Sequence, residues 1–272
     1  MIEHLVQGHP EHSFHALAAD QLGLPGQNYR TGSETHHQLY EALRTQEHGA
    51  AVVAIVNTRS GRVATSYPHL LEGDITVTGK VNLQIEHDLY APDGATRETV
   101  RYIHTQAPAY EQCKETIAAE YPHAQWVEEA DTARSAYMVS DFSSPEHAAI
   151  SPASAGIDAG LVRLHKGIQD DHTNTTSFFQ VGVGEHAVVP EDANITVFAL
   201  HSESPDIYGQ AEQILKEIGL EVALLHPDDA TEASLIVEVK TNYYGKASAA
   251  ATTALRGICS ATRIGGYASQ PA

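Results

Sequence analysis

Hydroxyl and amide side chains are concentrated in residues 168–181, which read IQDDHTNTTSFFQV. The polar first half of this stretch leads into an apolar, strand-like segment at residues 177–181. Asn174, Thr175 and Thr176 stand where the two halves meet. Hydroxyls at the mouth of a strand are well placed to contact a small polar ligand, so this stretch is the first candidate for a functional site.

A second candidate follows the most apolar run of the chain. Residues 50–56 read AAVVAIV, a continuous apolar run that is typical of a strand buried on both faces. The polar residues Asn57, Thr58, Arg59 and Arg62 come directly after it. Because open α/β sheets bind ligands at the carboxyl ends of their strands, we expect this loop to contribute to a ligand site.

The composition excludes several classes of function. The chain of 272 residues has 35 acidic and 16 basic residues and a net charge of −19, which repels nucleic acid and anionic membranes. No apolar run reaches the roughly eighteen residues that a membrane span needs. The first residues lack the apolar segment of a signal peptide. Cys113 and Cys259 stand far apart, so we expect no disulfide framework and a cytoplasmic location.

Histidines are frequent but form no recognised metal-binding pattern. The chain has 17 of them, and His9, His12 and His15 recur at every third residue. His36 and His37 form a further pair. No acidic or cysteine ligand stands at a known spacing from these residues. We therefore expect surface histidines and no metal site.

The order of the elements predicts two α/β lobes with a cleft between them. Strands and helices alternate up to residue 185, and the strand-like residues 75–91 are expected to break at Gly79 and Lys80. We expect strands at 50–56, 75–91, 100–103, 147–151 and 177–181, and helices after Ser13 and at 38–48, 64–72, 110–119 and 155–159, with residues 162–168 returning to the first lobe. Lobe 1 is expected at about residues 1–78 and 166–185, and lobe 2 at about 79–165.

The order of the predicted strands and helices changes after a linker at residues 184–194. Residues 194–272 follow the order βαββαβ, which predicts a split ferredoxin-like unit. Its strands are expected at 195–200, 221–225, 235–239 and 261–267, and its helices at 207–218 and 247–258.

The hydroxyl-rich stretch resembles a signature of the prephenate dehydratase family. Asn174, Thr175, Thr176 and Phe178 match N-x-T-R-F, in which the threonine is the proposed proton donor. The resemblance therefore makes Thr176 the expected donor, and Thr175 is the alternative if the alignment shifts by one. The arginine of the signature is Ser177 in this chain.

Three further motifs of the family occur in the same order along the chain. The first, G-P-x-G-T-F-S, falls on residues 9–15, where both glycines are histidines. The second, P-x-E-N-S-x-x-G-x-V, falls on the loop after residue 56, where its glutamate is Val56. The third, S-H-P-Q-A-L-x-Q-C, falls on residues 105–113. The resemblance implies that Asn57, Thr105 and Gln112 orient the substrate, and that Ser13, Thr58, Asn174, Ser177 and Phe178 bind it, with Arg59 added from the residues themselves as a further substrate-binding candidate.

The resemblance also implies the fold and the reaction. The family has a two-lobed catalytic domain like a type II periplasmic binding protein, and it converts prephenate to phenylpyruvate in phenylalanine synthesis without a metal or an organic cofactor. The C-terminal unit resembles an ACT domain, which in the family senses L-phenylalanine and serves in oligomers. Its effector residues would be Asp206, Tyr208 and Gly209, with a second sensing motif at residues 224–227. A homodimer or homotetramer is expected.

The missing signature arginine leaves the chemistry open. A buried carboxylate favours a bidentate, permanently charged partner, and Ser177 offers only one neutral hydrogen bond. Arg59 or Arg62 could supply the charge from across the cleft, unless both are solvent-exposed. Two other functions are therefore carried forward: a prephenate decarboxylase that keeps the ring hydroxyl, and a non-catalytic sensor of amino acids or dicarboxylates.

Overall fold

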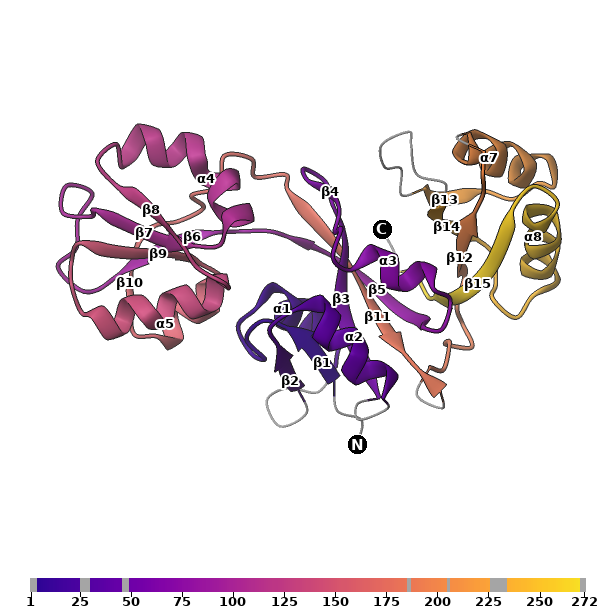
Figure 1. Ribbon diagram of the computed structural model, residues 1–272, viewed down its shortest axis with the longest axis horizontal. Coiled ribbons are helices and arrows are strands. Elements are labelled where there is room, and N and C mark those ends of the chain that lie inside the picture. Colours follow the sequence, from indigo (N-terminus) through magenta and orange to yellow (C-terminus); the bar gives the residue numbers. More distant parts are fainter. Residues whose placement is uncertain are drawn as a thin grey trace.

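The structure, a computed structural model, describes residues 4–24, 30–45, 49–184, 187–204, 206–225 and 234–269. Three bodies follow one another along its long axis: lobe 2, lobe 1 and the C-terminal unit (Figure 1). Two long connections join the lobes, one leaving lobe 1 after β5 and one returning to it at β11. In the part of the chain that the structure describes, no helix is long and apolar enough to cross a membrane.

Lobe 1 is built on the sheet order β2-β1-β3-β11-β5. Strand β1 runs parallel to β2 and β3, whereas β11 runs antiparallel to both of its neighbours. The strands are β1 (His4–Gln7), β2 (Arg30–Ser33), β3 (Ala50–Asn57), β4 (Gly61–Arg62), β5 (Thr76–Gln84) and β11 (Thr175–Gly182). The helices are α1 (Phe14–Gln21), α2 (His36–Arg44) and α3 (Tyr67–Leu71).

Lobe 2 repeats the same arrangement in the order β8-β7-β9-β6-β10. Its strands are β6 (Asp88–Ala91), β7 (Tyr102–Thr105), β8 (Gln125–Glu128), β9 (His147–Ser151) and β10 (Val162–His165). Its helices are α4 (Ala107–Glu120), α5 (Thr132–Phe142) and α6 (Ala153–Asp158). In each lobe one strand runs antiparallel to both of its neighbours, β11 in lobe 1 and β6 in lobe 2, within the predicted two-lobed α/β arrangement.

The expected break at Gly79 and Lys80 does not end the strand, because β5 runs through both residues, although its register with β11 shifts between Val77 and Gly79. Gly79 lies opposite Gln180, and a Cβ on it would approach Gln180 Oε1 to 2.9 Å. The glycine therefore allows close packing instead of ending the strand. The chain leaves lobe 1 only after Gln84, later than the boundary expected at residues 78 and 79.

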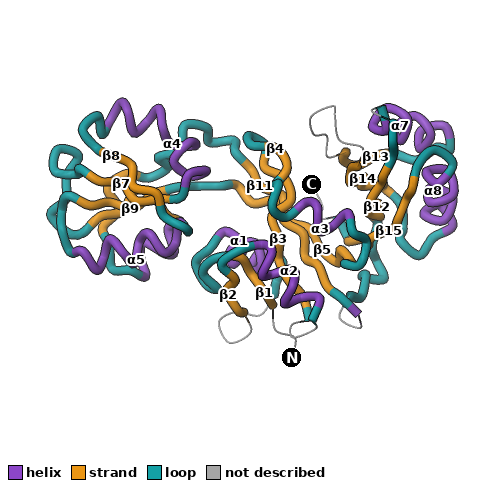
Figure 2. The backbone as a smooth tube through the Cα atoms, in the orientation of Figure 1, coloured by secondary structure: helices purple, strands orange, loops and turns teal. Residues whose placement is uncertain are grey.

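The C-terminal unit has the strand order β13-β14-β12-β15 with antiparallel neighbours, as predicted for a ferredoxin-like unit. Its elements are β12 (Ile195–His201), α7 (Ile207–Glu217), β13 (Val222–Leu225), β14 (Ser234–Lys240), α8 (Lys246–Arg256) and β15 (Ser260–Tyr267). Figure 2 shows α7 and α8 together on the outer side of this sheet.

The predicted effector residues lie at the start of α7. Asp206 is its N-cap residue, and Tyr208 and Gly209 are in its first turn. His226 and Pro227 of the second sensing motif lie outside the described residues. The ferredoxin-like topology is thus observed, while an ACT-like sensing role remains a prediction.

Strand β15 joins the C-terminal sheet to lobe 1 through a parallel bridge between Gly265 and Val77 of β5. Gly265 has φ +141°, and a Cβ there would lie 2.1 Å from the Val77 carbonyl oxygen, so only glycine fits. A continuous apolar core crosses this junction and includes Phe179, Ile195 and Ile236. Lobe 1 and the C-terminal unit therefore share one hydrophobic core.

Candidate functional site

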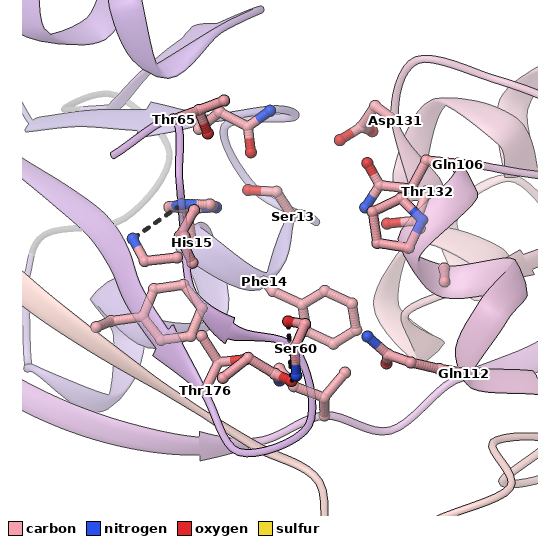
Figure 3. A pocket seen from close by; sticks show the side chains of 18 of the residues that line it. Ser13, Phe14, His15, Ser60, Thr65, Gln106, Gln112, Asp131, Thr132 and Thr176 are labelled. Atoms are coloured by element: carbon pink, nitrogen blue, oxygen red, sulfur yellow. Dashed lines mark hydrogen bonds between the residues drawn. The ribbon is translucent and has the colours of Figure 1, made fainter. Parts of the chain in front are cut away.

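A cavity of about 420 Å³ lies between lobe 1 and lobe 2. Figure 3 shows its lobe-1 wall with Ser13, His15 and Thr176, and its lobe-2 wall with Gln106, Gln112 and Asp131. Six residues predicted from the sequence line this cavity: Ser13, Asn57, Arg62, Gln112, Thr176 and Phe178.

Asn57 and Thr176 form the centre of the lobe-1 wall. They lie opposite each other on β3 and β11, and Asn57 Nδ2 donates to Thr176 Oγ1 at 2.9 Å. The other oxygen of Asn57 accepts from the backbone amides of Arg59 and Ser60, both at 3.0 Å, so the Asn57 side chain is held firmly. Because Thr176 accepts from Asn57, its own proton is available to a ligand in the cavity.

The hydroxyls of Thr176 and Thr175 have different surroundings. Successive side chains of a strand point to opposite faces, and Thr176 faces the cavity. The Thr175 hydroxyl donates to the Thr173 carbonyl oxygen at 3.2 Å, so its proton is already used outside the cavity. Thr176 is therefore the better placed of the two predicted proton donors.

An amide network connects the two lobes beneath the cavity. Asn174 Oδ1 accepts from Asn57 at 2.7 Å, and Asn174 Nδ2 donates to Gln112 Oε1 on α4 at 2.9 Å. His87 Nε2 also lies 3.2 Å from Gln112 Oε1, so it donates to the same oxygen. Gln112 Nε2 makes no hydrogen bond to the described residues and is free to reach a ligand.

The remaining predicted residues surround the cavity without lining its described wall. Thr105 is fully buried, and its hydroxyl donates to the Ile150 carbonyl oxygen at 3.2 Å. Ser177 points to the opposite face of β11, where its hydroxyl donates to Asn82 Oδ1 at 2.7 Å. The Ser177 side chain therefore faces away from the cavity. Described residues that the sequence predicted but that do not line the cavity are Thr58, Arg59, Thr105, Asn174, Thr175 and Ser177.

Arg62 is the one arginine or lysine among the described residues that line the cavity. Its guanidinium lies 4.4 Å from the centre of the Tyr67 ring, and its Nη1 donates to the Ser234 carbonyl oxygen of the C-terminal unit at 3.3 Å. Arg59, the other cation expected from the sequence, is exposed. The structure thus places one of the two expected cations at the cavity.

Three helices begin at the cavity wall. Their N-cap residues are Ser13 for α1, Gln106 for α4 and Asp131 for α5, and all three line the cavity. Helix N-termini carry partial positive charge and present backbone N–H groups, so they favour anions. The three helix N-termini therefore contribute partial positive charge to the cavity wall, beside the carboxylate of Asp131.

Two buried histidines in the cavity wall were not predicted as functional residues. His15 Nε2 and His36 Nε2 lie 3.3 Å apart, and both residues line the cavity. His15 stands where the family's G-P-x-G-T-F-S motif has its last serine, and His36 follows the capping Thr35 of α2. Surface histidines were expected, but His15 and His36 are buried, whereas His9 and His12 stack on each other and His9 also stacks on Tyr137 of lobe 2.

Burial makes three histidines of the site poor bases. Burial lowers the pKa of His36 and of His87 to about 4, and it lowers the pKa of His15 further below its usual value, with the neighbouring His36 adding to the effect. Each of these imidazoles is therefore neutral near pH 7.

These pKa values predict a loss of stability in mild acid. The unfolded chain binds protons at a pKa near 6.5, whereas the folded chain resists protonation down to about pH 4. The free energy of unfolding should therefore fall between pH 6.5 and 4, by about 2 kcal/mol at pH 5 for each of His36 and His87. Denaturant unfolding at pH 7 and pH 5 measures the loss, which should be smaller in His87→Gln by the contribution of that one histidine. An exposed-site control, His123→Gln, should leave it unchanged, and a flat profile would contradict the assignment.

The first two thirds of the chain resemble known sequences. A sequence model of the family described as prephenate dehydratase matches residues 5–186. A bifunctional chorismate mutase/prephenate dehydratase of Stutzerimonas stutzeri is 28% identical over 153 residues, which are 56% of this chain and 41% of that protein. Arogenate dehydratase/prephenate dehydratase 6 of Arabidopsis thaliana is 29% identical over 140 residues, 52% of this chain and 33% of that protein. The matches thus span less than half the length of these curated relatives.

Solved structures resemble the chain over nearly its full length. A prephenate dehydratase from Arthrobacter aurescens in complex with L-Phe has a TM-score of 0.82 at 22% identity, covering 99% of this chain and 92% of that one. A structure described as "GqqA- a novel type of quorum quenching acylases" has a TM-score of 0.79 at 24% identity, covering 98% of both chains. At these identities the likenesses establish the fold.

Proposed function

The chain belongs to the prephenate dehydratase family, and we propose that it converts prephenate to phenylpyruvate as a carbon–oxygen lyase. Because the same fold also occurs in a structure described as an acylase, the fold alone does not fix the reaction. The proposal therefore depends on the site.

One observation carries the proposal. The Thr176 hydroxyl faces the cavity, and its oxygen accepts from Asn57 Nδ2, so the hydroxyl proton is directed away from Asn57 and is available to a substrate. An N–H donated to the oxygen also stabilises negative charge on it as the proton leaves. A hydroxyl held in this way is a weak acid with a fixed direction, which a proton donor requires.

The reaction needs little else from the protein. In prephenate the bond between the ring and its carboxylate breaks, carbon dioxide leaves, and the bonding electrons complete the aromatic ring. The ring hydroxyl departs with the electron pair of its own C–O bond and takes a proton from Thr176, which forms water. The threonine regains a proton from solvent, so the overall reaction consumes one proton. Gln112 Nε2, across the cavity, is placed to orient the substrate.

We assign Arg62 as the cation that binds one carboxylate of prephenate. Arg62 lines the cavity, its guanidinium is held by the Tyr67 ring and the Ser234 carbonyl oxygen, and the helix N-termini add partial positive charge to the cavity wall. The Ser13 and Asn57 side chains line the same wall and add neutral polar groups.

Arg62→Ala should raise the KM for prephenate by about 10- to 100-fold, since a hydrogen bond to a charged group contributes about 1.5–3 kcal/mol. The value of kcat should change much less, because Arg62 is remote from the departing hydroxyl in this proposal. Arg59→Ala, which removes an exposed charge, should change KM less than Arg62→Ala. The reverse order of the two effects would assign the carboxylate to Arg59.

The test of the proposed function is the product formed from prephenate at neutral pH, with phenylpyruvate followed by its absorbance in alkali. Phenylpyruvate would support the dehydratase. Consumption of prephenate without phenylpyruvate would favour a decarboxylase that keeps the ring hydroxyl. Thermal stabilisation by prephenate without consumption would favour a sensor.

We also propose L-phenylalanine as an effector of the C-terminal unit. A structure with the same fold contains L-Phe. In this chain Asp206, Tyr208 and Gly209 form the start of α7, and the exposed Tyr208 ring is available to a ligand or to a second copy of the chain. The homodimer or homotetramer and the cytoplasmic location stay predictions.

A further inference from the structure

Three side chains form a hydrogen-bonded row in the lobe-1 wall of the cavity. Thr65 Oγ1 lies 2.9 Å from His36 Nδ1, and His36 Nε2 lies 3.3 Å from His15 Nε2. His15 Nε2 in turn lies 3.3 Å from the backbone nitrogen of Ala54 on β3. The row joins the loop after β4 and the first residues of α2 and α1, and all three side chains line the cavity.

The backbone of β3 fixes the proton positions in this row. The Ala54 N–H can only donate, so His15 Nε2 is an acceptor and carries no proton. A neutral imidazole with a bare Nε2 carries its proton on Nδ1. His36 Nε2 must then donate to His15, which leaves His36 Nδ1 as the acceptor for the Thr65 hydroxyl. The whole row therefore has one direction, from Thr65 to His15.

The row ends in a donor that has no protein partner. His15 Nδ1 makes no hydrogen bond to the described residues, and it is not among the fully enclosed polar atoms that lack one. Since His15 lines the cavity, its N–H is open to that space. The Phe178 ring packs edge-on against the imidazole, with ring centres 5.1 Å apart at 86°, so the ring has little freedom to turn.

We propose that His15 binds a carboxylate or carbonyl oxygen of the substrate through its Nδ1–H, and that His36 and Thr65 hold it in the required tautomer. This inference rests on the proposed function, because it places the same substrate in the same cavity. It also adds a neutral hydrogen-bond donor to a site that has little positive charge. Position 177 faces away from the cavity, and Arg62 is the one arginine or lysine in its described wall. A dicarboxylate therefore needs a further donor.

A matched pair of substitutions tests the direction of the donor. The amide nitrogen of an asparagine can take the place of Nδ1, whereas a glutamine amide reaches the place of Nε2. His15→Asn should thus keep the KM for prephenate within a few-fold of the wild type. His15→Gln keeps a partner for the Ala54 N–H but loses the donor to the cavity, so it should raise KM at least tenfold. Equal effects of the two variants would overturn the proposal.

The tautomer itself is measured on the unaltered protein. With ¹⁵N-labelled histidine, the His15 signal should show a protonated Nδ1 and a bare Nε2, and saturating prephenate should shift the Nδ1–H resonance downfield. A proton on Nε2, or an Nδ1–H that prephenate leaves unmoved, would overturn the proposal even if both variants failed to fold.

The same spectra, together with the product, test the role of His15 in binding separately from the dehydratase reaction. If prephenate shifts the Nδ1–H but yields no phenylpyruvate, the dehydratase assignment fails and the role of His15 in binding stands. If phenylpyruvate forms while the Nδ1–H stays unmoved, the reaction stands and the role of His15 fails. If prephenate neither reacts nor shifts any resonance, both are overturned.

Discussion

Replacing Thr176 with valine should lower kcat for phenylpyruvate formation by about 10²–10⁴-fold, the usual contribution of a positioned general acid. Valine keeps the branched shape of the side chain but has no hydroxyl, so the departing hydroxide of prephenate would have to take its proton from solvent. The KM should change little, because the hydroxyl proton matters most in the transition state. Thr176→Ser, which retains the donor, should recover most of the activity.

Thr175→Val is the matched control for this prediction. The two threonines are adjacent, but the Thr175 hydroxyl already donates to the Thr173 carbonyl oxygen. Loss of the Thr175 hydroxyl should change kcat for phenylpyruvate formation by only a few-fold. A large loss in Thr175→Val together with a small one in Thr176→Val would show that Thr175 is the donor and that the orientation of β11 in the cavity has been misassigned.

Lys80→Met should lower the free energy of unfolding by about 3–5 kcal/mol, because it leaves a buried carboxylate without its cation. Lys80 Nζ lies 2.8 and 2.9 Å from the two carboxylate oxygens of Glu238, which is 1% exposed. The Tyr267 hydroxyl donates to the same carboxylate, and the negative charge of Glu238 together with burial raises the pKa of that phenol. The cluster lies at the junction of lobe 1 and the C-terminal unit.

The double variant Lys80→Met, Glu238→Gln measures how much of the loss comes from the unpaired charge. Its free energy of unfolding should lie well above that of Lys80→Met, since replacing both partners removes the buried charge. Denaturant unfolding of the wild type, both single variants and the double variant gives the coupling. Additive losses would show that the pair is solvated and does not connect the two units.

Most of the fold could be predicted from the sequence because local patterns and tertiary packing agree. The run at 50–56 became the central strand β3, and Ser13 caps α1 through its hydroxyl, which accepts from the Ala16 amide. Gly79 misled the prediction because a glycine that permits close packing has the same local signature as one that ends a strand. Only the contact with Gln180, about a hundred residues later in the chain, separates the two.

Residues of the candidate site could be predicted where they fall in a family motif. They could not be predicted where residues from separate segments come together in the fold. Thr176, Asn57 and Gln112 match family motifs and line the cavity. The contact between His15 and His36 depends on how α1 and α2 pack against β3, and neither residue belongs to a recognised spacing. The side on which Ser177 lies could not be read from its motif, because strand alternation places it on the far face of β11, where it meets Asn82.

The central claim is that prephenate loses carbon dioxide and its ring hydroxyl in one reaction in the cavity between the lobes. The most direct test measures carbon dioxide and phenylpyruvate in the same sample of purified protein with prephenate. The account predicts equal amounts of the two products at every time point, with both rates reduced together in Thr176→Val. Carbon dioxide released without an equal amount of phenylpyruvate, or a rate that Thr176→Val leaves unchanged, would contradict it.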